Sequence, residues 1–218
     1  MVFCLLAAFG SAQASVVSLE SYSNGDWVPD FFANGVNVTV NSSLVNGREA
    51  AMIFDTRIPS AQDPDLNGPF TNVRDGSQYT PGNVIILSEN GSQYDPDDNN
   101  GPGFLEFIFD VPVQFDGFNA FDINDVDGLR VELYDSNGLI FTVRNQYAGA
   151  DNSYEEFLRP ASNVTRAVFN FHRTGAVGDF RFAAMPASEV PNPPSLILFG
   201  SVVAFLAHRR GKKGLKLC

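Results

Sequence analysis

The sequence predicts an all-β protein, an antiparallel β-sandwich of jelly-roll type, with an N-terminal signal peptide and a short C-terminal transmembrane helix. The central region alternates apolar and polar residues with a period of two and shows no sustained helical periodicity. Clusters of Gly, Asn, Asp and Pro divide it into about nine or ten short segments, which is typical of sandwiches and jelly rolls. Short apolar runs at 2–9 and 195–207 lie outside this pattern, near the two ends of the chain.

Each predicted strand carries apolar residues at alternate positions. Because successive side chains of a strand point to opposite faces, this spacing places them on one buried face. Two of the strands are joined by Asp135-Ser136-Asn137-Gly138 and return through 139–143, which predicts a hairpin. The residues expected on buried faces are Val36, Val38 and Val40; Leu105, Phe107, Phe109 and Val111; Leu129, Val131 and Leu133; Ala167, Phe169 and Phe171; and Phe180 and Phe182.

The length and charge of the chain indicate one acidic domain. At 218 residues, 44% of them hydrophobic, the chain is long enough for one globular domain with short appendages. Five of the 14 Lys and Arg lie within 209–216, whereas no Asp or Glu follows Glu189. The predicted domain, 15–186, therefore contains no lysine and is more acidic than the formal net charge of -11 indicates. Such a surface repels nucleic acid, which we do not expect as a partner, and attracts cations.

Cysteine and histidine are too scarce to support several kinds of site. Cys4 and Cys218 lie in the terminal segments, and His172 is the only histidine of the predicted domain. Disulfides, thiol nucleophiles and Cys-ligated zinc are therefore excluded from the domain. His172 has no nucleophile-elbow sequence to accompany it in a catalytic triad, so the candidate chemistry rests on carboxylates.

The first 14 residues have the pattern of a signal peptide. An apolar run is followed by Ala12-Gln13-Ala14, the small-x-small pattern after which signal peptidase cuts, although no basic residue precedes the run. We expect cleavage between Ala14 and Ser15. The alternative is a buried first helix or strand.

The last segment, 187–218, has the order of a membrane-associated tail. Prolines precede the apolar stretch 195–207, and Arg209 and Arg210 follow it. As a helix this stretch is about 20 Å long, shorter than the roughly 30 Å of a bilayer's hydrocarbon core. The two arginines can reach the membrane face and keep the charged end on the cytoplasmic side. An ordinary C-terminal anchor is one interpretation.

This tail resembles the PEP-CTERM sorting signal of Gram-negative and cyanobacterial surface proteins. The resemblance rests on Pro191, Pro193, Arg209 and Arg210 around the apolar stretch, while Asn192 stands where the family usually has Glu. It implies a processing partner, a membrane enzyme of the exosortase type, that removes or replaces the tail during export. Either interpretation predicts an exported domain, anchored to the membrane at least transiently and then located at the cell surface or outside the cell.

The central region resembles the extracellular β-sandwich domains that commonly precede such tails in environmental bacteria. The resemblance implies an association with the cell envelope or exopolysaccharide and brings no established activity. The stretches that carry it, between residues 55 and 182, are DPDL, GNVIILSE, DPDDNNGPG, FDIND, LYDSNG and RTGAVGDFRF.

Two loops of similar sequence, DPDLNGPF at 63–70 and DPDDNNGPGF at 95–104, concentrate the acidity, and FDINDVDG at 121–128 adds a third cluster. Carboxylates this dense repel one another unless they are neutralised, and Ca²⁺ binds six to eight oxygen ligands. The spacing is not that of an EF-hand, because Asn100 occupies the position that needs Gly. We expect at least one structural Ca²⁺, the alternative being that these residues only form turns. The candidate metal ligands are Asp63, Asp65, Asp95, Asp97, Asp98, Asn99, Asp122, Asp125 and Asp127.

These observations favour a non-catalytic, surface-sorted protein that associates with the cell envelope or exopolysaccharide. One alternative is a carbohydrate-binding module, which predicts a polar cleft or an aromatic row near the calcium loops. Another is an acidic glycoside hydrolase, which needs two facing carboxylates and is the one enzymatic activity that the acidic loops leave open.

Overall fold

The computed structural model describes residues 14–146 and 151–186. The predicted transmembrane helix, the sorting residues and all but the last residue of the predicted signal peptide lie outside these ranges. Within them, no helix is long and apolar enough to cross a membrane. The described residues up to Met185 belong to one compact unit.

The described residues form twelve strands and one short 3-10 helix. All strand pairs are antiparallel except β5 with β11. The elements are β1 (Ser15–Val16), β2 (Phe31–Ala33), β3 (Val36–Leu44), β4 (Ala51–Asp55), η1 (Pro64–Leu66), β5 (Phe70–Asn72), β6 (Gln78–Tyr79), β7 (Asn83–Leu87), β8 (Gly103–Phe121), β9 (Leu129–Asp135), β10 (Gly138–Arg144), β11 (Ser153–Phe171) and β12 (Ala176–Ala184).

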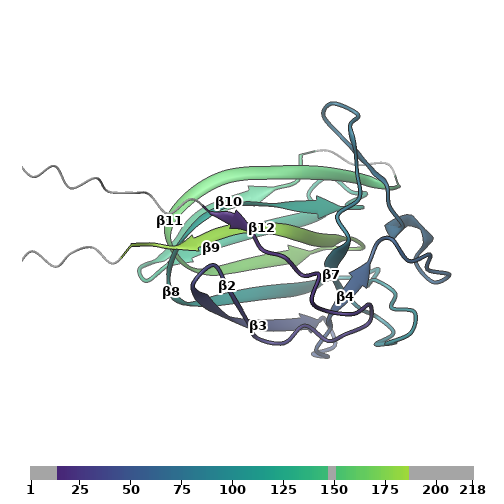
Figure 1. The fold of residues 1–218 in the computed structure, drawn as a ribbon, viewed down its shortest axis with the longest axis horizontal. Helices are drawn as coiled ribbons and strands as arrows, with labels where there is room; N and C mark the ends of the chain where they lie inside the picture. Colours follow the sequence, from purple (N-terminus) through teal and green to yellow (C-terminus); the bar gives the residue numbers. More distant parts are fainter. Residues whose placement is uncertain (1–13, 147–150, 187–218) are drawn as a thin grey trace, which may run out of the picture. The chain divides into compact units, whose positions relative to one another are not determined.

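The sandwich is built around the two longest strands, β8 and β11, which are 19 residues each and pair with each other (Figure 1). Their register shifts between Leu158 and Arg166, where the pair passes from one layer into the other. In the first layer, β2, β3, β9 and β10 join the start of β8 and the end of β11. In the second layer, β12 pairs with the end of β8 and β5 pairs with the start of β11. The strands β7 and β4 extend this layer beyond β12, and β6 extends it beyond β5. The prediction of an antiparallel β-sandwich is confirmed.

Phenylalanine rings fill the space between the layers. Phe107 of β8 lies 4.8 Å from Phe180 of β12, measured between ring centroids, in a T-shaped arrangement. Phe118 and Phe169 make a similar contact at 5.1 Å. Edge-to-face aromatic pairs of this kind add to the free energy gained by burying the rings. The predicted inward-facing residues are buried here, apart from the half-buried Val40 and Val111.

Val111 departs from the prediction, because its side chain is 39% exposed. It precedes Pro112 at the point where β8 changes layer, and the regular alternation of faces is interrupted there. The strand predicted from Leu105, Phe107, Phe109 and Val111 therefore continues to Phe121, and the short strands expected from turn signals do not account for the length of β8 or β11.

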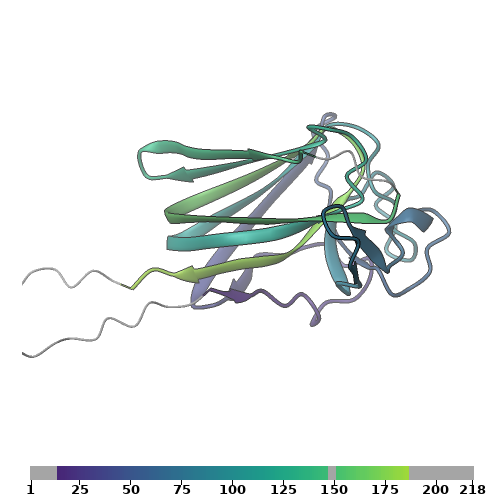
Figure 2. The ribbon, with the colours of Figure 1, turned by 90° about the horizontal axis from the view of Figure 1, so that it is seen from above.

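A second, smaller apolar cluster covers the outer face of the second layer. Leu66 of η1 and Phe70 of β5 pack there against Phe54, Ile86 and Phe121, and all five are buried. This cluster holds the 56–82 segment against the sheet. The acidic loop 63–70 is thereby fixed at the end of the sandwich opposite the described chain ends (Figures 1 and 2).

Candidate metal centre

The first acidic loop, 63–70, begins at η1 and is held by hydrogen bonds as well as by Leu66. The Ser60 hydroxyl accepts from the Asp63 N–H at 2.9 Å and donates to Asp95 Oδ1 at 2.7 Å. The Ser60 N–H donates to Asn67 Oδ1 at 3.0 Å. These contacts connect the first acidic loop to the second, 95–104.

The second loop meets the first through Asp98. The Asp98 N–H donates to Asp63 Oδ2 at 3.1 Å, and the Gly175 N–H donates to Asp98 Oδ2. Ser88 and Asp98 also form an isolated antiparallel bridge at the end of β7. The Gly175 N–H thus orients the Asp98 carboxylate, while the backbone of Asp98 is held by Asp63 and Ser88.

The third acidic segment starts where β8 ends. Asp122 has a φ of 54°, and its N–H donates to the Ser153 carbonyl at 2.8 Å. Its Oδ1 accepts from the Asn152 N–H at 3.0 Å. With its amide nitrogen turned toward the first loop, Asn152 also donates to the carbonyls of Asn67 and Asp65, at 2.6 and 2.8 Å. The start of β11 therefore ties Asp122 to the first loop.

Six aspartates come together at this end in two groups, which we call the acidic centre. Within each group, one carboxylate oxygen of every member lies within 4.8 Å of the others. Neither group contains an ion pair with an arginine among the described residues. The groups are Asp63, Asp97 and Asp98, and Asp65, Asp122 and Asp151.

Burial makes the charged form of these groups costly. Asp63, Asp98 and Asp122 are 4%, 7% and 1% exposed. Burial, followed by the neighbouring carboxylates of Asp65 and Asp98, raises the pKa of Asp63 to about 9. Burial also raises the pKa of Asp98 and of Asp122 to about 7, with Asp65 adding to the shift at Asp122. Without a cation, the acidic centre therefore retains protons near neutral pH.

The remaining predicted ligands have other partners. Asp95 accepts from Ser60, and the Asn99 amide donates to the Gly101 carbonyl at 2.5 Å. Asp125 forms an ion pair with Arg173 at 3.2 Å, and Asp127 forms one with Arg144 at 3.6 Å. The structure brings together five of the predicted aspartates and leaves these four residues outside the two groups.

Asp151 was not among the predicted ligands. It belongs to Asp151-Asn152, which directly precedes a strand and has none of the Asp-Pro-Asp pattern of the first two loops. A signal is present nonetheless, because Asp151 borders a strand end just as Asp122 does. Only the pairing of β11 with β8 brings the two together.

A polar cavity of about 220 Å³ opens beside the acidic centre. Asn124 lines it, donates to Asp122 Oδ2 at 3.3 Å, and has a buried Oδ1 without a hydrogen-bond partner among the described residues. This oxygen is a neutral acceptor next to a carboxylate, which suits a cation. The other lining residues are Asp65, Asn100, Ile123, Asp125, Gly128, Arg173 and Thr174.

Comparisons with known proteins add little to this geometry. No protein-family model matches the chain, and no curated protein matches it. Among solved structures, it is similar to the crystal structure of the F5/8 type C domain of a protein from Bacteroides fragilis. The two are 12% identical, the match covers 80% of this chain and 99% of that chain, and the TM-score is 0.34.

Proposed function

We propose that the chain is an exported, non-catalytic surface protein whose β-sandwich is stabilised by Ca²⁺ at the acidic centre. The observation that supports this most is the convergence of six aspartates from four loops, three of them buried, with no arginine paired to any of them among the described residues. Buried charges in proteins are normally paired or bound to metals.

The donor set favours a hard cation. All the grouped ligands are carboxylates, and Asn124 Oδ1 beside Asp122 adds a neutral oxygen. Ca²⁺ accepts six to eight such oxygens in flexible geometry, whereas Mg²⁺ requires a nearly ideal octahedron and keeps several waters. The two groups of three aspartates offer places for two ions. The ions would join four loops that otherwise repel one another.

Export and surface sorting are supported by the terminal segments alone. The proposed partners are an exosortase-type enzyme for the tail and the membrane for the apolar helix 195–207. An association with exopolysaccharide follows from the resemblance of the domain to those that precede such tails.

Carbohydrate binding is the second candidate function. The cavity beside Asp65 favours it, because a sugar hydroxyl there would be next to a bound cation and several polar side chains. Glycoside hydrolysis is less favoured: Asp63 and Asp98 are almost fully buried, so little of their carboxylates is open to a substrate.

The test is a thermal melt of the full-length chain in detergent with Ca²⁺, with Mg²⁺ and with EGTA. A ligand that binds only the folded state raises Tm by mass action. We expect Ca²⁺ to raise Tm clearly above the EGTA value and Mg²⁺ to raise it less. Equal Tm values in all three conditions would contradict the proposal and mean that the acidic loops serve only as turns.

A further inference from the structure

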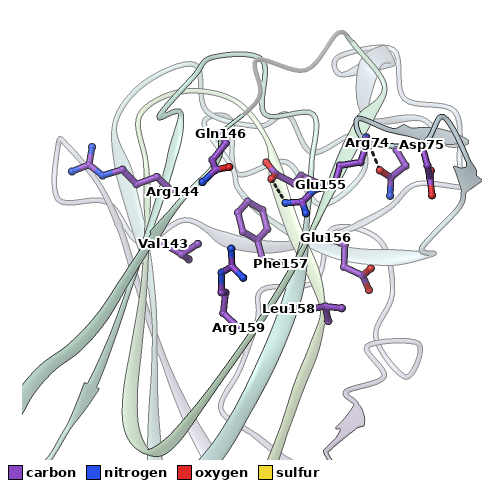
Figure 3. Close-up of a pocket in the computed structure, with 11 residues that line it drawn as sticks. Arg74, Asp75, Val143, Arg144, Gln146, Glu155, Glu156, Phe157, Leu158 and Arg159 are labelled. Carbon is purple, nitrogen blue, oxygen red and sulfur yellow. Dashed lines mark hydrogen bonds and ion pairs between the residues drawn. The ribbon is translucent and has the colours of Figure 1, made fainter.

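A second cavity lies away from the acidic centre, between β11, the end of β10 and the segment after β5. Its volume is about 340 Å³, within the range of small-ligand sites. Gln146, Phe157 and Arg159 point into it (Figure 3). The other lining residues are Asn72, Arg74, Asp75, Val143, Arg144, Glu155, Glu156 and Leu158.

Alternation along β11 supplies three chemically different groups to this cavity. Glu155, Phe157 and Arg159 occupy alternate positions of the strand and so share one face, which is buried at Glu155 and Phe157 and exposed at Arg159. The Phe157 ring is buried and stacks on Phe118 at 4.7 Å, which fixes an apolar wall. The strand thereby presents an acid, an aromatic ring and a base in sequence.

Arg159 is the positive group that this cavity offers to a ligand. Among the described residues, it is the one arginine with neither an ion pair nor a hydrogen bond, and it is exposed. Neighbouring Arg144 is only loosely paired with Asp127, at 3.6 Å and with both side chains about half exposed. In so acidic a domain, an arginine without a carboxylate partner is unusual. Its planar guanidinium matches a carboxylate with two parallel hydrogen bonds.

Glu155 is a buried acid in the wall of the same cavity. Its side chain is buried, and Oε1 pairs with Arg74 at 2.9 Å (Figure 3). Oε2 is buried and has no hydrogen-bond partner among the described residues. An unsatisfied buried carboxylate oxygen is costly unless a donor reaches it. Because this oxygen is closed to a ligand in the open cavity, the role of Glu155 is to hold Arg74 beside the cavity through Oε1.

We propose that this cavity binds a uronic-acid unit of an acidic polysaccharide. The sugar carboxylate pairs with Arg159, and the sugar ring lies in the cavity that Phe157 and Leu158 help to line. The Gln146 amide is placed to bond a further hydroxyl. This inference rests on the second candidate function, carbohydrate binding, but places it in this cavity and not in the one beside Asp65; it names the ligand class and does not require Ca²⁺.

The space next to this cavity can hold a saccharide longer than one sugar unit. An adjoining cavity of about 660 Å³ shares Val143, Arg144, Gln146 and Arg159 with the first. Arg159 thus stands between two spaces, and a polysaccharide can continue from one into the other past its guanidinium group.

The experiment is isothermal titration of the full-length chain in detergent, with trigalacturonate as the probe and neutral galactotriose as its matched control. We expect trigalacturonate to bind at least about tenfold more tightly, the usual size of one charge-assisted pair. Arg159→Gln should abolish that preference. The control Arg57→Gln, an exposed arginine that lines neither cavity, should preserve it.

Three outcomes would overturn the inference. Equal binding of the two saccharides would show that the sugar carboxylate is not recognised. Equal losses of trigalacturonate affinity in Arg159→Gln and Arg57→Gln would show that only the net charge of the protein matters. A triglutamate peptide that binds as tightly as trigalacturonate makes the cavity a peptide site. Because Arg159 is exposed, the Tm of Arg159→Gln and its response to Ca²⁺ should match the wild type. A failed calcium response with intact uronate binding would reject the metal proposal alone.

Discussion

The Asp98 N–H donates to Asp63 Oδ2 at 3.1 Å, joining two acidic loops that are 35 residues apart in sequence. A backbone donor compensates only part of a buried carboxylate's charge, and both aspartates have raised pKa values because they are buried. The loops are therefore held together against their own repulsion. A cation between them would convert this repulsion into attraction.

Removing one negative charge from the acidic centre should have opposite effects on the stability of the calcium-free protein and on its affinity for Ca²⁺. We expect Asp122→Asn to raise the Tm of the calcium-free protein, because a buried charge is lost while the acceptor of the Asn152 N–H remains. Calcium affinity should fall by about tenfold or more, since it depends on the number of charged ligands. Melts and calcium titrations of the purified chain measure both quantities.

The matched control is Asp125→Asn, an exposed aspartate of the same segment that pairs with Arg173. Surface pairs contribute little, so both its Tm and its calcium affinity should stay near the wild-type values. Equal calcium affinities in Asp122→Asn and wild type would place any bound ion elsewhere.

The calcium-free protein should lose stability as pH rises from about 5 to 8. The pKa of Asp122 is about 7 in the folded state against an ordinary value of 3.8, and the pKa of Asp98 is shifted in the same direction. Between those values the folded state holds more protons than the unfolded state, so the free energy of unfolding falls with increasing pH. Asp55 and Asp110 have lowered pKa values, so their opposite contribution is complete above about pH 5.

With saturating Ca²⁺ this loss should disappear, because the ion stabilises the carboxylate forms. The difference in Tm between calcium and EGTA should therefore grow from pH 5 to pH 8, in melts at constant ionic strength. A calcium-free Tm that rises across the same range would show that these carboxyl groups are not buried as protonated acids.

Periodicity predicted the strands well, because burial of one face imposes alternation wherever a strand stays in one layer. It failed at Val111, where β8 leaves the first layer, since the change depends on long-range pairing with β11. The acidic loops were likewise recognisable from sequence. Which carboxylates meet was not, because Asp122 and Asp151 are brought together by strand register. The free guanidinium of Arg159 is also a tertiary property, set by which acids lie within its reach.

The phenylalanine core should dominate stability. Phe180 is fully buried and contacts both Phe107 and Phe169. Phe180→Ala should lower the free energy of unfolding by about 3–5 kcal/mol, through lost burial and a residual cavity. Chemical denaturation at fixed calcium measures the change. Phe32→Ala is the matched control, because Phe32 is 69% exposed and its loss should cost little. Similar losses in both variants would contradict the assigned core.

Gly117 permits the close approach of β8 and β11 beside Phe157. Its φ is 156°, and a Cβ added there would lie 2.1 Å from the Phe157 carbonyl oxygen. Gly117→Ala should therefore displace β11 and lower the free energy of unfolding. Gly138→Ala is the matched control for backbone strain without a steric clash, because φ is 133° there and no atom lies within 4 Å of the added Cβ.

The loss in Gly117→Ala should exceed that in Gly138→Ala by about 1–3 kcal/mol, the usual cost of overpacking. Because Phe157 forms a wall of the proposed uronate cavity, Gly117→Ala should also weaken trigalacturonate binding, while Gly138→Ala leaves it unchanged. Equal denaturation midpoints for the two variants would mean that β11 can move away at Phe157 without lowering the free energy of unfolding. The pairing of β8 with β11 would then be too loose there to hold Arg159 in position for a ligand.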